Sequence, residues 1–224
     1  MSEKQKNGLN NKSKTLKIII ISAILLFAGT FYLTKHFTVK ELHFQKKQKL
    51  IAIQPFESFP ESLCLILDSN IKNFYHCQTI ILPHINLPSS SYYKARNRYR
   101  ADSIIRYLRR NIPEDCHYII GLTRQDISVT NGNIPDYGIF GLGFCPGKSC
   151  VVSTYRYRKN VSEQLFHKRF LKVCLHELGH NMGLPHCKSQ NCMMQDAEGK
   201  ISTVDQEVMK LCNKCESILS LNIF

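Results

Sequence analysis

The chain has 224 residues and a formal net charge of +13, from 30 Lys and Arg against 17 Asp and Glu. Hydrophobic residues make up 43% of it, enough to bury a core, and the lack of any internal repeat excludes a repeat protein. The positive excess is compatible with a nucleic acid, an acidic substrate or an anionic lipid surface as a partner.

The N-terminal region carries an almost wholly apolar run without charge, residues 18–34, between Lys17 and Lys35. Its length is at the short end of what spans a bilayer as a helix. A cleaved signal peptide is the alternative, although no small-x-small cleavage site follows the run. The sequence therefore predicts a basic tail with a transmembrane signal anchor over residues 1–36, and a linker over residues 37–47.

The membrane orientation of this anchor has to be judged from its flanks. Five lysines lie ahead of the run and five shortly after it, so the positive-inside rule does not discriminate. A short tail ahead of a long soluble domain is the usual arrangement of a signal anchor. We expect a single-pass protein with its domain outside the cytoplasm, whose positive charge then faces anionic lipid headgroups.

The remaining residues, 48–224, predict one α/β domain with a mixed, mostly parallel sheet covered by helices. Apolar periodicity and turn residues indicate the elements. We expect strands at 49–55, 79–82, 116–122, 137–144 and 150–155, helices at 60–74 and 92–110, a loop at 131–133 and a turn at 145–149. The helix over 92–110 is rich in Lys and Arg, which we interpret as a solvated face, and no nucleic-acid partner is expected.

The last predicted helix begins near Asn160, which forms a capping box with Glu163, and it leads into the pattern H-E-x-x-H-x-x-G-x-x-H. His176 and His180 are four positions apart, so both imidazoles lie on one helix face and can reach one zinc ion. The helix then ends and the chain turns back, through Gly183 and Pro185, which lets His186 return as a third ligand. Three protein ligands leave one zinc position open, as catalysis requires, and Glu177 stands beside them as a candidate general base.

Four cysteines follow this motif in two close pairs: Cys187, Cys192, Cys212 and Cys215. Four thiolates suit a closed, tetrahedral structural zinc site, which would stabilise a segment too short to bury its own core. Two disulfides or buried free thiols are the alternatives. Cys145 and Cys150 have no second pair beside them, so a hairpin disulfide or free thiols are expected there.

From His176 to Cys215 the chain reads H-E-x-x-H-x-x-G-x-x-H-C-x4-C-x-M-x17-C-x-x-C, which resembles the archaemetzincin family of zinc metallopeptidases at every fixed residue. The resemblance implies a metzincin-like catalytic domain with two zinc ions. It divides the domain into an upper subdomain, 48–183, and a small lower one, 184–224, held by the four-cysteine zinc. It also implies that Met194 is the methionine of a Met-turn under the catalytic site, where ordinary core packing is the alternative.

The sequence therefore predicts a membrane-tethered zinc peptidase that acts on a peptide or protein substrate. Metzincin-like enzymes align their substrate along the edge strand ahead of the active-site helix, and residues 151–154 are the matching candidate, unless they form an ordinary edge strand. The alternative function is a catalytically silent zinc protein that binds a peptide or protein partner. Glu177 argues against it, because binding alone needs no base beside the metal.

Overall fold

The computed structural model describes residues 25–27, 48–206 and 208–223. The chain divides into two units, residues 1–47 and 48–224, of which the second contains the folded elements discussed below. Leu25, Leu26 and Phe27 are helical, and the rest of the predicted membrane anchor lies outside the described residues. Among the helices that the structure does describe, none combines the length and the apolar character needed to cross a bilayer.

A five-stranded sheet forms the centre of the second unit, with the order β2-β1-β5-β9-β8. Its strands are β1 (Leu50–Pro55), β2 (Gln78–Ile81), β5 (Tyr118–Thr123), β8 (Gly141–Gly143) and β9 (Ser149–Ser153). The first four strands of that order run parallel, and β8 pairs antiparallel with β9. The predicted mixed, mostly parallel sheet is confirmed.

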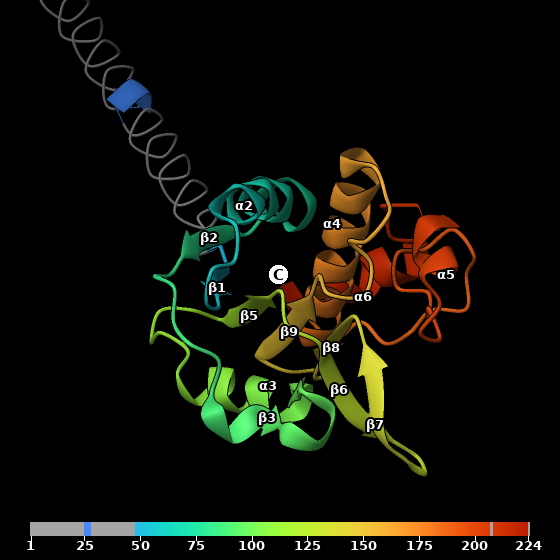
Figure 1. Cartoon of the computed structure of the whole chain (residues 1–224). Coiled ribbons are helices and arrows are strands. Elements are labelled where there is room, and N and C mark those ends of the chain that lie inside the picture. The colour runs from blue at the N-terminus through green and yellow to red at the C-terminus, as the bar shows by residue number, and fades with distance from the viewer. Residues whose placement is uncertain (1–24, 28–47, 207, 224) are drawn as a thin grey trace, which may run out of the picture. The chain divides into compact units, whose positions relative to one another are not determined.

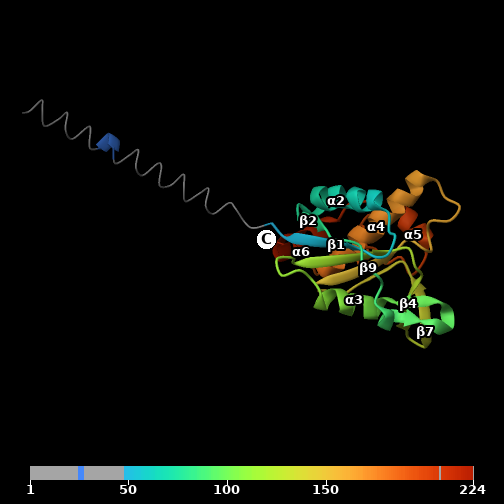
Figure 2. The ribbon, with the colours of Figure 1, turned by 60° about the vertical axis from the view of Figure 1, so that its left-hand side comes forward.

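Helices cover both faces of this sheet, as Figures 1 and 2 show. The helices α2 (Glu61–Tyr75) and α4 (Glu163–Asn181) pack on one face around a core that includes Leu67 and Phe170. On the other face, α3 (Ala101–Arg110) buries the apolar stripe that its periodicity predicts, with Ile104 and Ile105 fully buried. The alternation of strands and helices thus places helices on both faces of the sheet, as expected for parallel strands.

Two short strands of a second, four-stranded sheet replace the first half of the predicted helix 92–110. The chain forms β3 (Tyr92–Tyr93), a single turn of 3-10 helix at Lys94–Arg96 and β4 (Arg98–Arg100) before α3 begins. The helix prediction was wrong there because the helical stripe starts only at Ala101. Asn97 takes a left-handed conformation, with φ 50°, and ends the short turn. Arg98 is then held in extended chain by ion pairs with Asp126 and Asp136.

The second sheet is completed by the hairpin of β6 (Ile127–Asn131) and β7 (Ile134–Ile139), in the order β3-β4-β6-β7. The predicted loop at 131–133 is the tip of this hairpin, where Gly132 has φ 55°. The predicted strand 137–144 is divided, because its first part, β7, belongs to this sheet and its second part, β8, to the central one.

The predicted edge strand needs a correction. Residues 151–153 lie in β9, which is buried along its whole length between β5 and β8, and Thr154 follows it. The outer strand on this side is β8, because the chain after β7 turns back alongside β9 and covers it.

After α4, the described residues contain only two further helices, α5 (Ile201–Gln206) and α6 (Asn213–Ile223). A further 3-10 turn lies at Ser89–Ser91.

Candidate active site

The helix α4 carries most of the predicted site. Its first turn is capped by Ser162, whose Oγ accepts the N–H of Leu165 at 3.3 Å. The predicted capping box of Asn160 and Glu163 was wrong, because Asn160 has φ 56° and lies two residues ahead of the cap. From Phe170 to Asn181 the helix is almost completely buried, so it passes through the core before presenting its last turns to a cleft.

The structure brings the three motif histidines together. One ring nitrogen of His176, of His180 and of His186 lies within 4.8 Å of those of the other two. The ring centroids are separated by 4.6 Å for His176 and His180, 5.4 Å for His176 and His186, and 4.7 Å for His180 and His186. The chain reaches this arrangement through Gly183, whose φ of 88° lets it turn sharply after α4.

Each of these imidazoles has its Nδ1 atom occupied by an oxygen acceptor. The Nδ1 of His176 lies 2.8 Å from the Met193 carbonyl, and that of His180 lies 2.8 Å from the Leu184 carbonyl. A carbonyl only accepts, so both Nδ1 atoms carry the proton and both Nε2 lone pairs are free for a metal. The Nδ1 of His186 lies 3.2 Å from a carboxylate oxygen of Asp196.

Burial keeps the imidazoles of His176 and His180 neutral, which is the form that binds metals. Burial and the neighbouring His180 lower the pKa of His176 to about 3. Burial also lowers the pKa of His180, against the hydrogen bond to Leu184. The three donors therefore fit a divalent transition metal, for which imidazole nitrogen is a preferred ligand.

Glu177 lies beside the histidines with its side chain buried against β8. Burial raises the pKa of its carboxyl group to about 8, and a hydrogen bond from the backbone of Gly143 opposes that rise. A Cβ atom on Gly141 would lie 2.7 Å from both Cγ and Oε1 of Glu177. A Cβ atom on Gly143 would lie 2.8 Å from the backbone carbonyl oxygen of Glu177. Two glycines in the edge strand thus give the carboxyl group its place.

A cleft of about 440 Å³ opens over this group. His176, Glu177 and His186 line its floor, together with Val173 from α4. Its walls come from the β6–β7 hairpin on one side, with Tyr137 and Ile139, and from residues 196–199 and Val204 on the other. The lining combines apolar side chains with the polar groups of the motif and with Lys172, Asp196 and Glu198, and a concave site with convergent polar groups is the usual form of a binding site.

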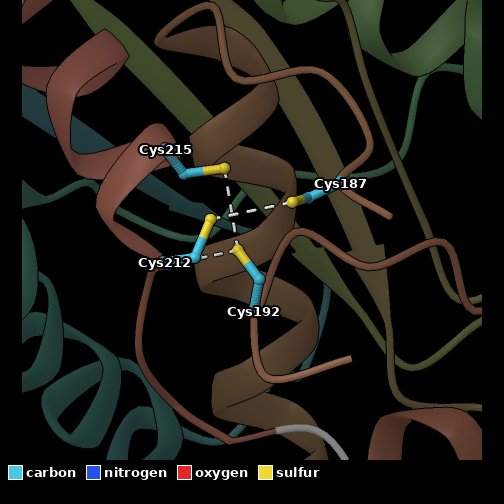
Figure 3. Close-up of side chains that lie close together, drawn as sticks. All are labelled: Cys187, Cys192, Cys212 and Cys215. Atoms are coloured by element: carbon cyan, nitrogen blue, oxygen red, sulfur yellow. Dashed lines mark hydrogen bonds between the residues drawn. The ribbon is translucent and has the colours of Figure 1, made fainter. Parts of the chain in front are cut away.

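The four C-terminal cysteines form a second cluster (Figure 3). Their sulfur atoms lie within 4.8 Å of one another, with 3.7 Å between those of Cys187 and Cys212 and 3.6 Å between those of Cys192 and Cys215. The backbone of Cys212 donates to the Cys192 sulfur at 3.4 Å. A hydrogen bond from the backbone of Cys215 lowers the pKa of Cys212 to about 7, which favours the thiolate that a metal binds.

The two clusters share a stretch of chain. His186 of the first cluster is followed directly by Cys187 of the second. Met193, whose carbonyl holds His176, follows Cys192 directly, and the backbone of Cys187 donates to the Met194 carbonyl at 2.7 Å. The position of two imidazoles thus depends on the segment that the four cysteines hold together.

Met194 lies fully buried underneath α4. A Cβ atom on Gly179 would lie 2.6 Å from the Met194 sulfur and 3.0 Å from the Tyr75 hydroxyl oxygen, so the glycine allows this close approach. Met194 thus packs against α4 at Gly179, directly beside His180 in the sequence, and its role as the methionine of a Met-turn stays a prediction. Of the two alternatives predicted for Cys145 and Cys150, the structure shows free thiols and not a hairpin disulfide, with Cys145 exposed and Cys150 buried.

Several residues of the site could not be found from the sequence. Asp196 lies beside His186, Gly141 and Gly143 lie against Glu177, and Tyr137 contributes to the cleft wall. The one available signal is the Gly-x-Gly spacing in a short strand, because a missing side chain on alternate positions leaves one face of the strand open to a neighbour.

Comparison with known proteins agrees with this geometry. The sequence profile of Peptidase family M54 matches residues 61–220. The archaemetzincin of Halobacterium salinarum is 29% identical over 174 residues, which are 74% of this chain and 96% of that protein. The crystal structure of the Methanopyrus kandleri archaemetzincin, 26% identical, superposes with a TM-score of 0.69 over 80% of this chain and 97% of that one.

A second crystal structure, of the Archaeoglobus fulgidus archaemetzincin complexed with malonate, is 25% identical and has a TM-score of 0.65 over 75% of this chain and 99% of that one. The mixed α/β fold is thus that of the archaemetzincin structures, and the family match covers most of the domain. The chain belongs to Peptidase family M54, the archaemetzincins, and is a zinc metallopeptidase.

Proposed function

We propose that His176, His180 and His186 hold the catalytic zinc and that Glu177 is the general base of peptide hydrolysis. The observation that carries this proposal is the convergence of three imidazoles, two with Nδ1 bonded to a carbonyl, beside one buried carboxyl group. When bound, zinc polarises the scissile carbonyl and makes a water ligand more acidic. A catalytically silent zinc protein is not favoured, because it has no use for the carboxyl group.

The residues around the metal have separate functions in proton transfer, in positioning Glu177 and in substrate alignment. The Glu177 carboxylate accepts the proton of the attacking water and then delivers it to the departing amine. Gly141 and Gly143 keep the carboxyl group in place from the edge strand. We place the substrate as an added strand beside β8, whose outer side has no partner strand within the described part of the chain.

Metal removal tests the proposed function. We expect a chelator such as phenanthroline to abolish hydrolysis of a mixed peptide library, and stoichiometric zinc to restore it. The library is followed by mass spectrometry, which also identifies the cleaved bonds. Hydrolysis that persists after complete removal of zinc would contradict the assignment of these histidines.

A second, structural zinc is proposed at Cys187, Cys192, Cys212 and Cys215. Four sulfur atoms within 4.8 Å of one another, in free-thiol form, match the donor set of a closed tetrahedral site. We expect two zinc ions per chain in elemental analysis of the purified protein, and one after selective loss of the catalytic ion.

We also propose that the apolar run at residues 18–34 tethers the enzyme to a membrane, with its catalytic domain outside the cytoplasm. The support is its sequence alone: seventeen residues without charge between Lys17 and Lys35. Fractionation of cells that produce the whole chain should recover it with membranes after an alkaline wash, and protease added outside should digest the domain. Recovery in the wash supernatant would contradict the tether.

Substitution of Gly141 by Ala should reduce hydrolysis and leave the metal in place. The new Cβ atom would lie 2.7 Å from Cγ and Oε1 of Glu177, so the carboxyl group has to move. A misplacement of about 1 Å costs on the order of a hundredfold in rate. The measurement is kcat/KM on a cleaved peptide, together with zinc content. Gly132→Asn is the matched control, since its φ of 55° suits Asn and no atom lies within 4 Å of the added Cβ.

Asp196→Asn should weaken the catalytic zinc. The carboxylate lies 3.2 Å from Nδ1 of His186, the one imidazole of the three that is exposed, and so it orients the ligand with the greatest freedom. Loss of such a partner typically costs about 10- to 100-fold in metal affinity. Competition with a fluorescent zinc chelator measures it. Glu198→Gln, an exposed change in the same cleft wall, should leave the affinity unaltered.

A further inference from the structure

The connections of the central sheet create a crevice that the peptidase site does not use. From β1 the chain passes through α2 to β2 on one side of β1, and it returns through α3 to β5 on the other side. The covering helices α2 and α3 lie on opposite faces of the sheet (Figure 2). The carboxyl ends of β1 and β5 therefore diverge at a topological switch point, where open α/β sheets bind their ligands.

Two adjoining hollows open at this point, of about 380 and 330 Å³. The first is lined by residues 56–59, which follow β1, and by Arg124 and Gln125, which follow β5. Arg124 and Arg158 line both hollows, and Lys159 lines the first. Neither hollow shares a lining residue with the cleft over the histidines.

The crevice is rich in available positive charge. Arg124, Arg158 and Lys159 are exposed and form no ion pair with any residue in 48–206 or 208–223. By contrast, the charge of nearby Arg156 is neutralised, because its guanidinium group forms a bidentate ion pair with Asp126, with hydrogen bonds of 2.8 and 2.9 Å. Lys159 lies 5.8 Å from the ring centre of Tyr155, an exposed aromatic side chain on the same rim.

Two carboxylates also border the crevice, Glu57 and Glu163, and neither forms an ion pair with these cations. Glu57 accepts a hydrogen bond from the Gln125 amide at 2.9 Å, which links the two loops of the switch point. Glu163 is 85% exposed and lies 3.8 Å from His167. The second hollow also contains Pro60, at the start of α2, where no side chain caps the first turn, so the positive end of this helix faces the hollow.

We propose that this switch-point crevice binds the phosphate group of a small phosphorylated molecule. Two guanidinium groups and one ammonium group match the charge and the several acceptor oxygens of a phosphate dianion better than those of a single carboxylate. The combined hollows have room for a small organic group attached to the phosphate. Tyr155 offers that group an aromatic surface.

Calorimetric titration of the full chain tests this proposal, with a hydroxamate saturating the catalytic metal so that no probe binds there. The probes are inorganic phosphate, glycerol phosphate as a phosphomonoester, and succinate as a dicarboxylate. We expect glycerol phosphate to bind, whether or not inorganic phosphate also binds. Succinate should bind about tenfold more weakly than glycerol phosphate or not at all. Failure of glycerol phosphate to bind, or binding of succinate with equal affinity, overturns the proposal.

The double variant Arg124→Gln/Arg158→Gln should lose at least about tenfold in affinity, because each hydrogen bond to a charged group is removed. Its matched control is Arg109→Gln/Arg110→Gln, which removes the same charge from exposed positions on α3. An equal loss in both pairs would show general charge attraction and overturn the site. Peptide hydrolysis by both variants should stay at the wild-type rate, and Lys159→Gln alone provides the test if the double variant does not fold.

Discussion

Glu177→Gln should reduce kcat for peptide hydrolysis by about a hundred- to ten-thousandfold, the usual contribution of a general base. The amide has nearly the shape of the carboxyl group, so it fits against Gly141 and Gly143, but it cannot accept a proton from water. The three imidazoles keep their contacts with Met193, Leu184 and Asp196, and zinc content should therefore stay at the wild-type value.

The control for this experiment is Glu198→Gln, the same chemical change in the wall of the same cleft. Glu198 is 70% exposed and pairs with Lys200, so its loss should leave kcat within about twofold. A Glu177→Gln variant that hydrolyses peptides at the wild-type rate with full zinc would show that another group takes the proton, and the proposed mechanism would be wrong.

Cys215→Ser should remove the structural zinc and, with it, the catalytic activity. In zinc-finger peptides such an ion contributes about 10 to 16 kcal/mol of binding free energy, which is also folding free energy. The substituted thiol is buried, and within the described residues no disulfide holds the segment from Cys187 to Cys215. Because Cys187 adjoins His186 and Cys192 adjoins Met193, the catalytic ligands lose their positions together with the cluster.

Zinc analysis, thermal unfolding and peptide hydrolysis measure the three consequences of Cys215→Ser separately. We expect loss of one zinc, a lower melting temperature and a catalytic zinc affinity reduced at least about tenfold. Cys145→Ser is the control, since this thiol is exposed and lies outside the cluster. A variant with one zinc and full activity would show that the two clusters are independent.

The grouping of the candidate metal ligands could be predicted from the sequence, because the spacing of His176 and His180 along one helix fixes their geometry. His176 and His180 are one turn apart in any α-helix, and Gly183 with Pro185 two residues later leaves the chain few ways to continue before His186. The cysteine pairs are similarly local. The central parallel strands could be predicted too. A short, continuous apolar run such as residues 50–55 is typical of a strand that is buried on both faces of a sheet.

The rest depends on contacts between distant segments, which periodicity does not encode. The order of β8 and β9 decides which strand is the edge, and both have short apolar or glycine-rich sequences that fit either place. The strands β3 and β4 carry helix-compatible residues, and they are extended because Arg98 binds Asp126, just ahead of β6, and Asp136 in β7. Asp196 approaches His186 only once the segment after Met194 has folded back.

One exposed thiol has a practical use. Of the ten cysteines, Cys145 alone is exposed, and it lies two residues beyond the edge strand β8, while the remaining nine are buried or half-buried. A maleimide fluorophore should therefore attach at a single position of the zinc-loaded enzyme without mutagenesis. Its emission would then follow ligand occupancy of the adjoining strand in real time, including ligands that are never cleaved.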